Sequence, residues 1–176
     1  MARTYESLMT TKAPHLVITI LGAGYVGLTT AALFAQAGYK VYALEPNPER
    51  LEAIRKGKSF FYEQGLDAVI ASGLDTGMLV PTDSYADSIP KSHMVFSCVG
   101  TPDNPDGSSD LSYVHAAATQ TAQYIADDAI YIQKSTVPVG TGRDVMAEFK
   151  KLGKTTAYVS NPEFLRESTA LYDTLY

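Results

Sequence analysis

The chain has 176 residues, of which 45% are hydrophobic, and it carries 14 basic against 19 acidic residues for a net charge of −5. This length and composition predict one globular domain with a sizeable core, and they argue against a disordered chain. The acidic balance and the lack of an apolar run of roughly 18 residues lead us to expect neither nucleic acid nor a membrane as partner. The single cysteine, Cys98, excludes an intrachain disulfide and favours a reducing, cytoplasmic location.

Residues 1–14 lack the apolar stretch of a secretory signal, so we expect a loosely ordered extension there. Residues 16–21 then form an uninterrupted apolar run, typical of a strand buried on both faces. Glycines follow at Gly22, Gly24 and Gly27, and a helix is predicted over 26–37. In this pattern the first glycine permits a tight turn, the second lets a pyrophosphate approach the backbone, and the third lets helix and strand pack closely. The amino terminus of the helix favours the phosphate charge.

A second strand is predicted over 39–44, and Glu45 follows it, 18 residues beyond Gly27. Dinucleotide-binding units carry an acid at an offset of about 20 residues. Such a carboxylate accepts hydrogen bonds from the adenosine ribose and repels a 2′-phosphate, so we predict NAD rather than NADP. The alternative is a glycine turn followed by a solvated glutamate.

Asn47 and Pro48 predict the start of a helix over 48–56. Arg50 lies on its first turn, where it either flanks the adenosine of the cofactor or is a solvated surface residue. The following elements are predicted as an irregular stretch at 59–65, a helix at 66–72, a strand at 78–80 and a helix at 84–89 that is stopped by Pro90.

Residues 93–99 predict the next buried strand. We interpret His93 as a strand-edge residue rather than a catalytic one. Cys98 lies within the apolar run and has no basic neighbour, so we interpret it as an inert small hydrophobe rather than a nucleophile.

The rest of the chain repeats the alternation of strand and helix. It predicts a turn-rich loop at 100–110, a helix at 111–127 capped by Asp110, a strand at 129–134, a helix at 141–152 and a strand at 155–160. Repeated strand–helix units of near 30 residues predict an α/β fold, a doubly wound parallel sheet of the Rossmann type in three αβα layers.

Four stretches are expected at the carboxyl edge of this sheet, where open α/β sheets bind ligands: 22–27, 98–110, 134–140 and 161–167. The last three carry the polar residues Thr101, Thr136 and Glu163. Hydroxyl and carboxylate groups in such places position a water molecule or a substrate hydroxyl beside a nicotinamide ring.

Four blocks, in the order GAGYVG, VGTPDNPDGSSDLSYV, KSTVPVGTG and SNPEFLRESTALYD, resemble the UDP-glucose/GDP-mannose 6-dehydrogenase family over residues 16–176. YEQGL at 62–66 is a fifth, looser match. The resemblance implies an oxidoreductase that converts the C6 alcohol of a nucleotide sugar to a carboxylate with two NAD⁺, through a thioester on a cysteine. NPEFLRES suits both the UDP-glucose and the GDP-mannose enzymes, and ALYDTLY favours UDP-glucose and its product UDP-glucuronate.

The resemblance also implies roles for individual residues. Thr136 and Glu163 are expected to hold the catalytic water, and Glu163 to act in general-base steps. The expected cofactor contacts are Gly22, Gly24, Tyr25, Val26, Gly27, Glu45 (in place of the more usual Asp), Arg50, Val99, Thr101, Ser135 and Glu167. The expected substrate contacts are Phe164, Leu165, Arg166 and Glu167, and Ser168 stands where many members have glycine.

The family's catalytic cysteine lies in a C-x-P-K-D motif of a second domain, and Cys98 does not match that motif. We therefore expect residues 15–176 to be the NAD-binding domain of a longer enzyme, inactive alone, whose central helix would form a homodimer. The apolar ending TALYDTLY agrees with that expectation. Three alternatives stay open: a dehydrogenase for GDP-mannose or another UDP-sugar, a stand-alone NAD-sensing module, and a β-hydroxyacid dehydrogenase. The last does not account for STVPVGTG and NPEFLRES.

Overall fold

The structure, a computed structural model, describes residues 15–166 and 168–175. The predicted extension at 1–14 and the predicted ligand contact Glu167 therefore lie outside the described residues. The strands are β1 (Val17–Leu21), β2 (Lys40–Leu44), β3 (Leu79–Thr82), β4 (Met94–Ser97), β5 (Ile130–Gln133) and β6 (Ala157–Ser160). The helices are α2 (Tyr25–Gln36), α3 (Pro48–Arg55), α4 (Leu66–Asp75), α5 (Tyr85–Ser88), η1 (Ile89–Lys91), α6 (Ser112–Ala122), α7 (Thr141–Lys151) and α8 (Ala170–Leu175).

The six strands form one parallel sheet in the order β3-β2-β1-β4-β5-β6. The strand order reverses between β1 and β4, which is the place where doubly wound folds bind a dinucleotide. The predicted fold class is confirmed, and the glycine-rich turn after β1 opens onto this reversal.

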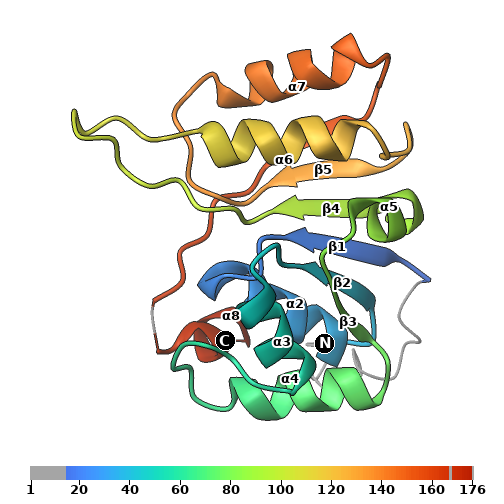
Figure 1. The fold of residues 1–176 in the computed structure, drawn as a ribbon, viewed down its shortest axis with the longest axis vertical. Coiled ribbons are helices and arrows are strands. Elements are labelled where there is room, and N and C mark those ends of the chain that lie inside the picture. Colours follow the sequence, from blue (N-terminus) through green and yellow to red (C-terminus); the bar gives the residue numbers. More distant parts are fainter. Residues whose placement is uncertain (1–14, 167, 176) are drawn as a thin grey trace, which may run out of the picture.

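Each face of the sheet has its own hydrophobic core. Alternate residues of β1 separate them, since Ile18 and Ile20 belong to the core beneath α2 and α4, while Leu21 belongs to the core beneath α6 and α7. Figure 1 shows α6 beside β5 with α7 beyond it, and α2, α3, α4 and α8 grouped near the other end of the sheet. The two covered faces make the three layers that the alternating sequence predicts.

Several local signals in the sequence act as expected. The Asn47 side chain accepts hydrogen bonds from the backbone N–H groups of Glu49 and Arg50, each at 3.0 Å, so the predicted cap of α3 is confirmed. His93 accepts a hydrogen bond from Val17 N–H through Nδ1 at 3.0 Å, which agrees with its interpretation as a strand-edge residue. Among the described residues, no helix is long and apolar enough to cross a membrane.

Two helix ends differ from the prediction by several residues. The helix predicted over 84–89 does end before Pro90, since α5 ends at Ser88 and Pro90 lies in the 3₁₀ turn η1, where a proline without an N–H is tolerated. The helix predicted over 66–72 continues to Asp75, and Thr76 ends it. The helix predicted over 111–127 ends at Ala122.

The chain after α6 is held by residues far away in the sequence. Lys154 Nζ donates to the carbonyl oxygen of Ile125 at 2.7 Å, and the Thr156 hydroxyl donates to that of Ala126 at 3.2 Å. The backbone that follows α6 is therefore hydrogen-bonded outside a helix, and Ile125 is fully buried in the core.

Candidate functional site: the carboxyl edge of the sheet

The glycine turn after β1 is packed against the turn after β4. Gly22 has a φ of +81°, and a Cβ there would lie 3.1 Å from the carbonyl oxygen of Cys98. A Cβ on Gly27 would lie 1.9 Å from the carbonyl oxygen of Gly22, so this position admits no side chain. Gly24 is different, because nothing lies within 4 Å of the Cβ position it leaves empty. The three glycines thus serve a turn, an open cradle and a close contact.

Glu45 lies at the carboxyl end of β2 and is 4% exposed. Its Oε1 accepts a hydrogen bond from the backbone N–H of Asn47 at 2.9 Å. Gly22 N–H donates to the carbonyl oxygen of Leu44 at 2.9 Å, so the glycine turn and the residue before Glu45 are joined directly. The acid predicted to bind a ribose is therefore fixed beside the cradle.

A row of aromatic rings links the first turns of α3 and α2. The Arg50 guanidinium lies 4.8 Å from the centre of the Phe60 ring. Phe60 packs edge-on against Phe61 at 5.2 Å, and Phe61 packs against Tyr25 at 5.0 Å. Arg50 is an exposed residue whose guanidinium contacts this row, and its place beside the adenosine stays a prediction.

The Tyr25 hydroxyl is occupied by other parts of the protein. It lies 2.7 Å from Glu63 Oε2 and 2.9 Å from the carbonyl oxygen of Arg166. Burial and the bond to Glu63 raise the pKa of Tyr25 to about 12, so the phenol stays protonated at neutral pH. Tyr25 thereby joins the start of α2 to the segment that follows β6.

The loops after β4 and β5 hold each other. The Ser135 hydroxyl donates to the carbonyl oxygen of Val99 at 2.6 Å, and the Thr101 hydroxyl donates to that of Thr136 at 3.2 Å. The Thr136 side chain itself is exposed. In this geometry Ser135 fixes the backbone of Val99, so any effect of its hydroxyl on a bound cofactor passes through that backbone.

Glu163 and Cys98 lie near each other after β6 and β4. Glu163 Oε2 is buried and has no hydrogen-bond partner among the described residues. Burial raises the pKa of the Cys98 thiol to about 12; Lys134 lowers it and Glu163 raises it further. The buried thiol agrees with an inert Cys98, and the unpartnered carboxylate oxygen of Glu163 is a group able to accept a proton or a hydrogen bond.

The predicted substrate contacts in the segment after β6 differ in how exposed they are and in whether they are already bound. Phe164 is 90% exposed, whereas Leu165 is half-buried. The Arg166 guanidinium forms two bonds to Asp173, at 3.1 Å from Nε and 2.6 Å from Nη2. Asp173 in turn has its pKa lowered to about 2, first of all by the hydrogen bond from Arg166. Arg166 is therefore paired within its own segment.

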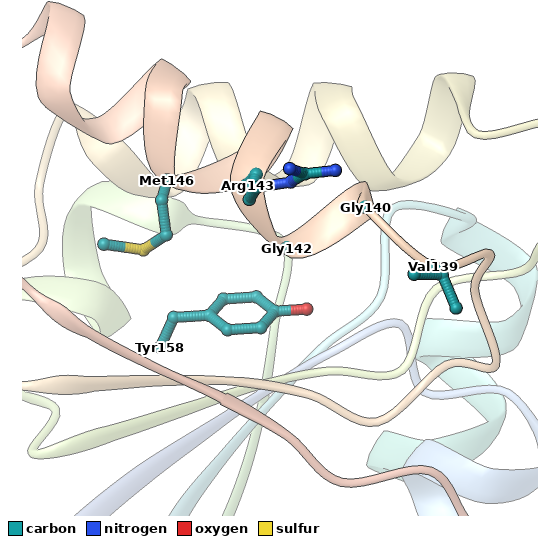
Figure 2. Close-up of a pocket in the computed structure, with 6 residues that line it drawn as sticks. All are labelled: Val139, Gly140, Gly142, Arg143, Met146 and Tyr158. Atoms are coloured by element: carbon teal, nitrogen blue, oxygen red, sulfur yellow. The ribbon is translucent and has the colours of Figure 1, made fainter.

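A hollow of about 450 Å³ lies at the outer edge of the sheet, between α7 and β6 (Figure 2). Figure 2 shows Met146 and Arg143 on the helix facing the Tyr158 ring, with Val139 in the preceding loop. None of the residues predicted for cofactor or substrate lines it. We therefore assign the site to the glycine turn and its neighbouring loops.

The parallel sheet, the strand reversal and the cradle at Gly24 define a dinucleotide-binding domain of the Rossmann type. The sequence of residues 16–176 matches the UDP-glucose/GDP-mannose dehydrogenase family, NAD binding domain. The chain belongs to this family, and the resemblance expected from its motifs is confirmed. NAD is the cofactor of this domain.

Relatives agree with that assignment. The UDP-glucose 6-dehydrogenase of Pseudomonas aeruginosa is 42% identical over 163 residues, which are 89% of this chain and 36% of that protein. The crystal structure of a ternary complex of GDP-mannose dehydrogenase from Pseudomonas aeruginosa superposes with a TM-score of 0.86 at 32% identity, covering 89% of this chain and 38% of that one. UDP-glucose dehydrogenase from Pyrobaculum islandicum gives 0.85 at 36% identity, with 93% and 39% covered. The chain thus spans little more than a third of the length of these relatives.

The residues present fit NAD. The empty Cβ position at Gly24 leaves room for a pyrophosphate, and the first N–H groups of α2 follow it directly. The carboxylate of Glu45 is the acceptor that a ribose requires.

Sequence reasoning missed two residues that hold the site together. Glu63 binds Tyr25, and Asp173 binds Arg166. The YEQGL match contains Glu63, but a match of this kind does not show which side chain it contacts 38 positions away.

Proposed function

We propose that this chain is the NAD-binding part of a longer UDP-glucose 6-dehydrogenase, an enzyme that oxidises the C6 alcohol of UDP-glucose to UDP-glucuronate. Two relatives that are 41–42% identical to this chain are UDP-glucose 6-dehydrogenases, which supports this substrate. The catalytic cysteine, the central helix and a homodimer formed through it would belong to the part of the protein beyond this chain. A cytoplasmic location remains part of the proposal.

One structural observation carries the proposal: the open position at Gly24 and the buried, unpartnered Oε2 of Glu163 both follow strands at the carboxyl edge of one sheet. Glu163 follows β6, and its charge helps to raise the pKa of Cys98, which follows β4. A carboxylate at this edge would be available for the proton transfers of an alcohol oxidation.

The cofactor contacts divide between the two halves of the sheet. The backbone around Gly22, Gly24, Val26 and Gly27 would hold the pyrophosphate, with Glu45 on the ribose and Arg50 beside the adenosine. Val99, Thr101 and Ser135 would line the nicotinamide side. When bound there, NAD⁺ supplies a hydride acceptor.

The remaining residues would act on the substrate and on water. Thr136 and Glu163 would hold a water molecule, and the unpartnered oxygen of Glu163 would take its proton. Phe164, Leu165 and Arg166 would meet the nucleotide sugar, with Glu167 near both ligands. Because Arg166 is paired with Asp173, its contribution would come through its backbone.

The proposal is tested on the 176-residue chain and on the longer protein. Calorimetric titration should show that the chain binds NAD⁺, and the absorbance of NADH should show no steady turnover of UDP-glucose, because the nucleophile and half of the site would lie outside this chain. Steady NADH production by the chain would contradict the fragment proposal. A substrate panel on the longer enzyme decides the sugar.

GDP-mannose is the second candidate substrate. The ternary-complex structure of GDP-mannose dehydrogenase resembles this domain at a TM-score of 0.86, as closely as the UDP-glucose enzyme does. Turnover of GDP-mannose rather than UDP-glucose in the panel would favour it.

A further inference from the structure

We propose that Glu63 is a positioning residue that couples NAD⁺ binding at the glycine turn to the docking of the segment 166–171. The inference rests on the proposed function, because it assumes that NAD⁺ lies over Gly24 and that this segment belongs to the substrate side. It concerns a residue that contacts neither proposed ligand.

Glu63 holds two distant parts of the chain with one carboxylate. Its Oε2 lies 2.7 Å from the Tyr25 hydroxyl, and its Oε1 accepts the backbone N–H of Leu171 at 3.1 Å. These partners are 38 and 108 positions away in the sequence. Glu63 as a residue is 7% exposed, so water competes little for either bond.

The two partners of Glu63, Tyr25 and Leu171, lie next to the proposed cofactor site and on the proposed substrate segment. Tyr25 is the first residue of α2, directly after the open cradle at Gly24. Leu171 lies in the first turn of α8, on the segment that contains Arg166, and its side chain packs on the core beneath α2. Figure 1 shows α8 beside α2. Glu63 therefore lies between the cofactor side and the substrate side of the site.

The local chain keeps Glu63 in this place. Gly65 has a φ of +83° and directly precedes α4, so the loop turns sharply after Glu63. Phe61 packs on the Tyr25 ring at 5.0 Å, which holds the phenol against the carboxylate. The Tyr25 hydroxyl is also 2.9 Å from the carbonyl oxygen of Arg166, so the same group contacts the segment directly.

A physical consequence follows from these contacts. NAD⁺ on the first turn of α2 restricts Tyr25, and a restricted Tyr25 favours the Glu63 geometry in which Leu171 is bound. By linkage, a docked segment must then raise the affinity for NAD⁺ by the same factor. The order of the substrate segment and the occupancy of the cofactor site are thus coupled through Glu63.

Hydrogen exchange at Leu171, read with and without NAD⁺, tests the coupling on the 176-residue chain. In the wild type, saturating NAD⁺ should slow exchange there at least about threefold. Glu63→Ala should abolish this response and raise the Kd for NAD⁺ about fivefold. Glu63→Gln should retain most of the response, because its amide oxygen still accepts from Leu171 and its amide nitrogen still reaches Tyr25. Glu52→Ala, which removes an exposed glutamate of α3, is the matched control and should leave both readings unchanged.

The outcomes separate the possibilities. Glu63→Ala could speed exchange at Leu171 and yet leave unchanged both the affinity for NAD⁺ and the slowing of exchange by NAD⁺. Glu63 would then only hold Leu171 in place, and the inference would be overturned. If circular dichroism shows that Glu63→Ala is unfolded, Tyr25→Phe decides in its place, since it removes only the hydroxyl; an unchanged response there also overturns the inference. NAD⁺ binding without any change at Leu171 in the wild type overturns the inference alone. Failure of the wild type to bind NAD⁺ overturns the proposed function and the inference with it.

Discussion

The Cβ that Gly27 lacks would lie 1.9 Å from the carbonyl oxygen of Gly22, deep inside a van der Waals contact. The oxygen belongs to the backbone and a Cβ is bonded directly to Cα, so neither atom can rotate away. Gly24, two residues after Gly22, has no atom within 4 Å of its own missing Cβ. Two glycines of one motif therefore serve different ends, one in folding and one in binding.

Alanine substitutions distinguish the role of Gly27 in folding from the role of Gly24 in binding. Gly27→Ala should lower the free energy of unfolding by about 3 kcal/mol or more, because helix and strand must move apart. Gly24→Ala should change stability by less than about 0.5 kcal/mol, because its φ of −69° suits any residue. It should nevertheless weaken NAD⁺ binding at least about tenfold by filling the cradle. Urea denaturation and calorimetric titration check the pair, and unchanged NAD⁺ affinity in Gly24→Ala would place the pyrophosphate elsewhere.

Glu45 should decide between the two nicotinamide cofactors. Glu45→Gln removes the charge that repels a 2′-phosphate and weakens the bonds to the ribose. We expect the Kd for NAD⁺ to rise about tenfold, as the loss of a charged hydrogen bond implies, and the preference over NADP⁺ to shrink. Titration with both cofactors measures this. Glu49→Gln, an exposed glutamate on the first turn of α3, serves as control, and an equal preference in all three proteins would remove Glu45 from the site.

Cys98 should be unreactive while the protein is folded. Its pKa is raised to about 12, so at pH 8 only about one thiol in ten thousand is a thiolate. A disulfide reagent should therefore react slowly with the native chain at pH 8, faster as the pH rises toward 12, and at once in guanidinium chloride. Because the chain has a single cysteine, one equivalent of released chromophore reports it alone. Rapid labelling of the native protein would show that the thiol is accessible.

Ser168 adopts a φ of +70°, the only positive φ among the non-glycine residues that the structure describes. An L-residue pays about 1 kcal/mol for this conformation, so Ser168→Gly should stabilise the docked segment by that order. Ser168→Ala keeps the Cβ and should bring no gain. Hydrogen exchange at Leu171 compares the three proteins, and a loss of protection in Ser168→Gly would mean that the greater freedom of glycine in the undocked segment outweighs the relief of strain.

Patterns local in the sequence predicted most of the fold. The apolar run of β1, the glycine spacing and the Asn47-Pro48 start of α3 each depend on residues a few positions apart, and each is confirmed. The predicted end of α6 was wrong, and the chain after Ala122 is held by Lys154 and Thr156, about 30 positions away, which a local pattern does not contain. The end of the helix before Pro90 was predicted to within one residue.

The same division applies to the site. Gly22, Gly24, Gly27 and Glu45 were found because one βαβ unit contains them all. The contact between Glu63 and Leu171 spans 108 positions and leaves no periodic signal in the sequence. The pairing of Arg166 with Asp173 was also missed, and it means that the Arg166 guanidinium is bound within its own segment while the backbone stays available for the expected substrate contact. The roles of the predicted site residues stay predictions until ligands are measured.

The position of β1 in the sheet has a consequence for how the chain acquires its structure during synthesis. β1 is made first, yet it pairs with β2 on one side and with β4 on the other, so its second neighbour arrives only when the ribosome has delivered residues to Ser97. Until then one edge of β1 has no partner strand, so the pairing at the centre of the sheet has to wait for a contact between residues far apart in the sequence. The same strand joins the two halves of the sheet, so a nascent chain stalled before β4 would hold the adenosine half of the cradle without the backbone of Cys98 against which Gly22 packs.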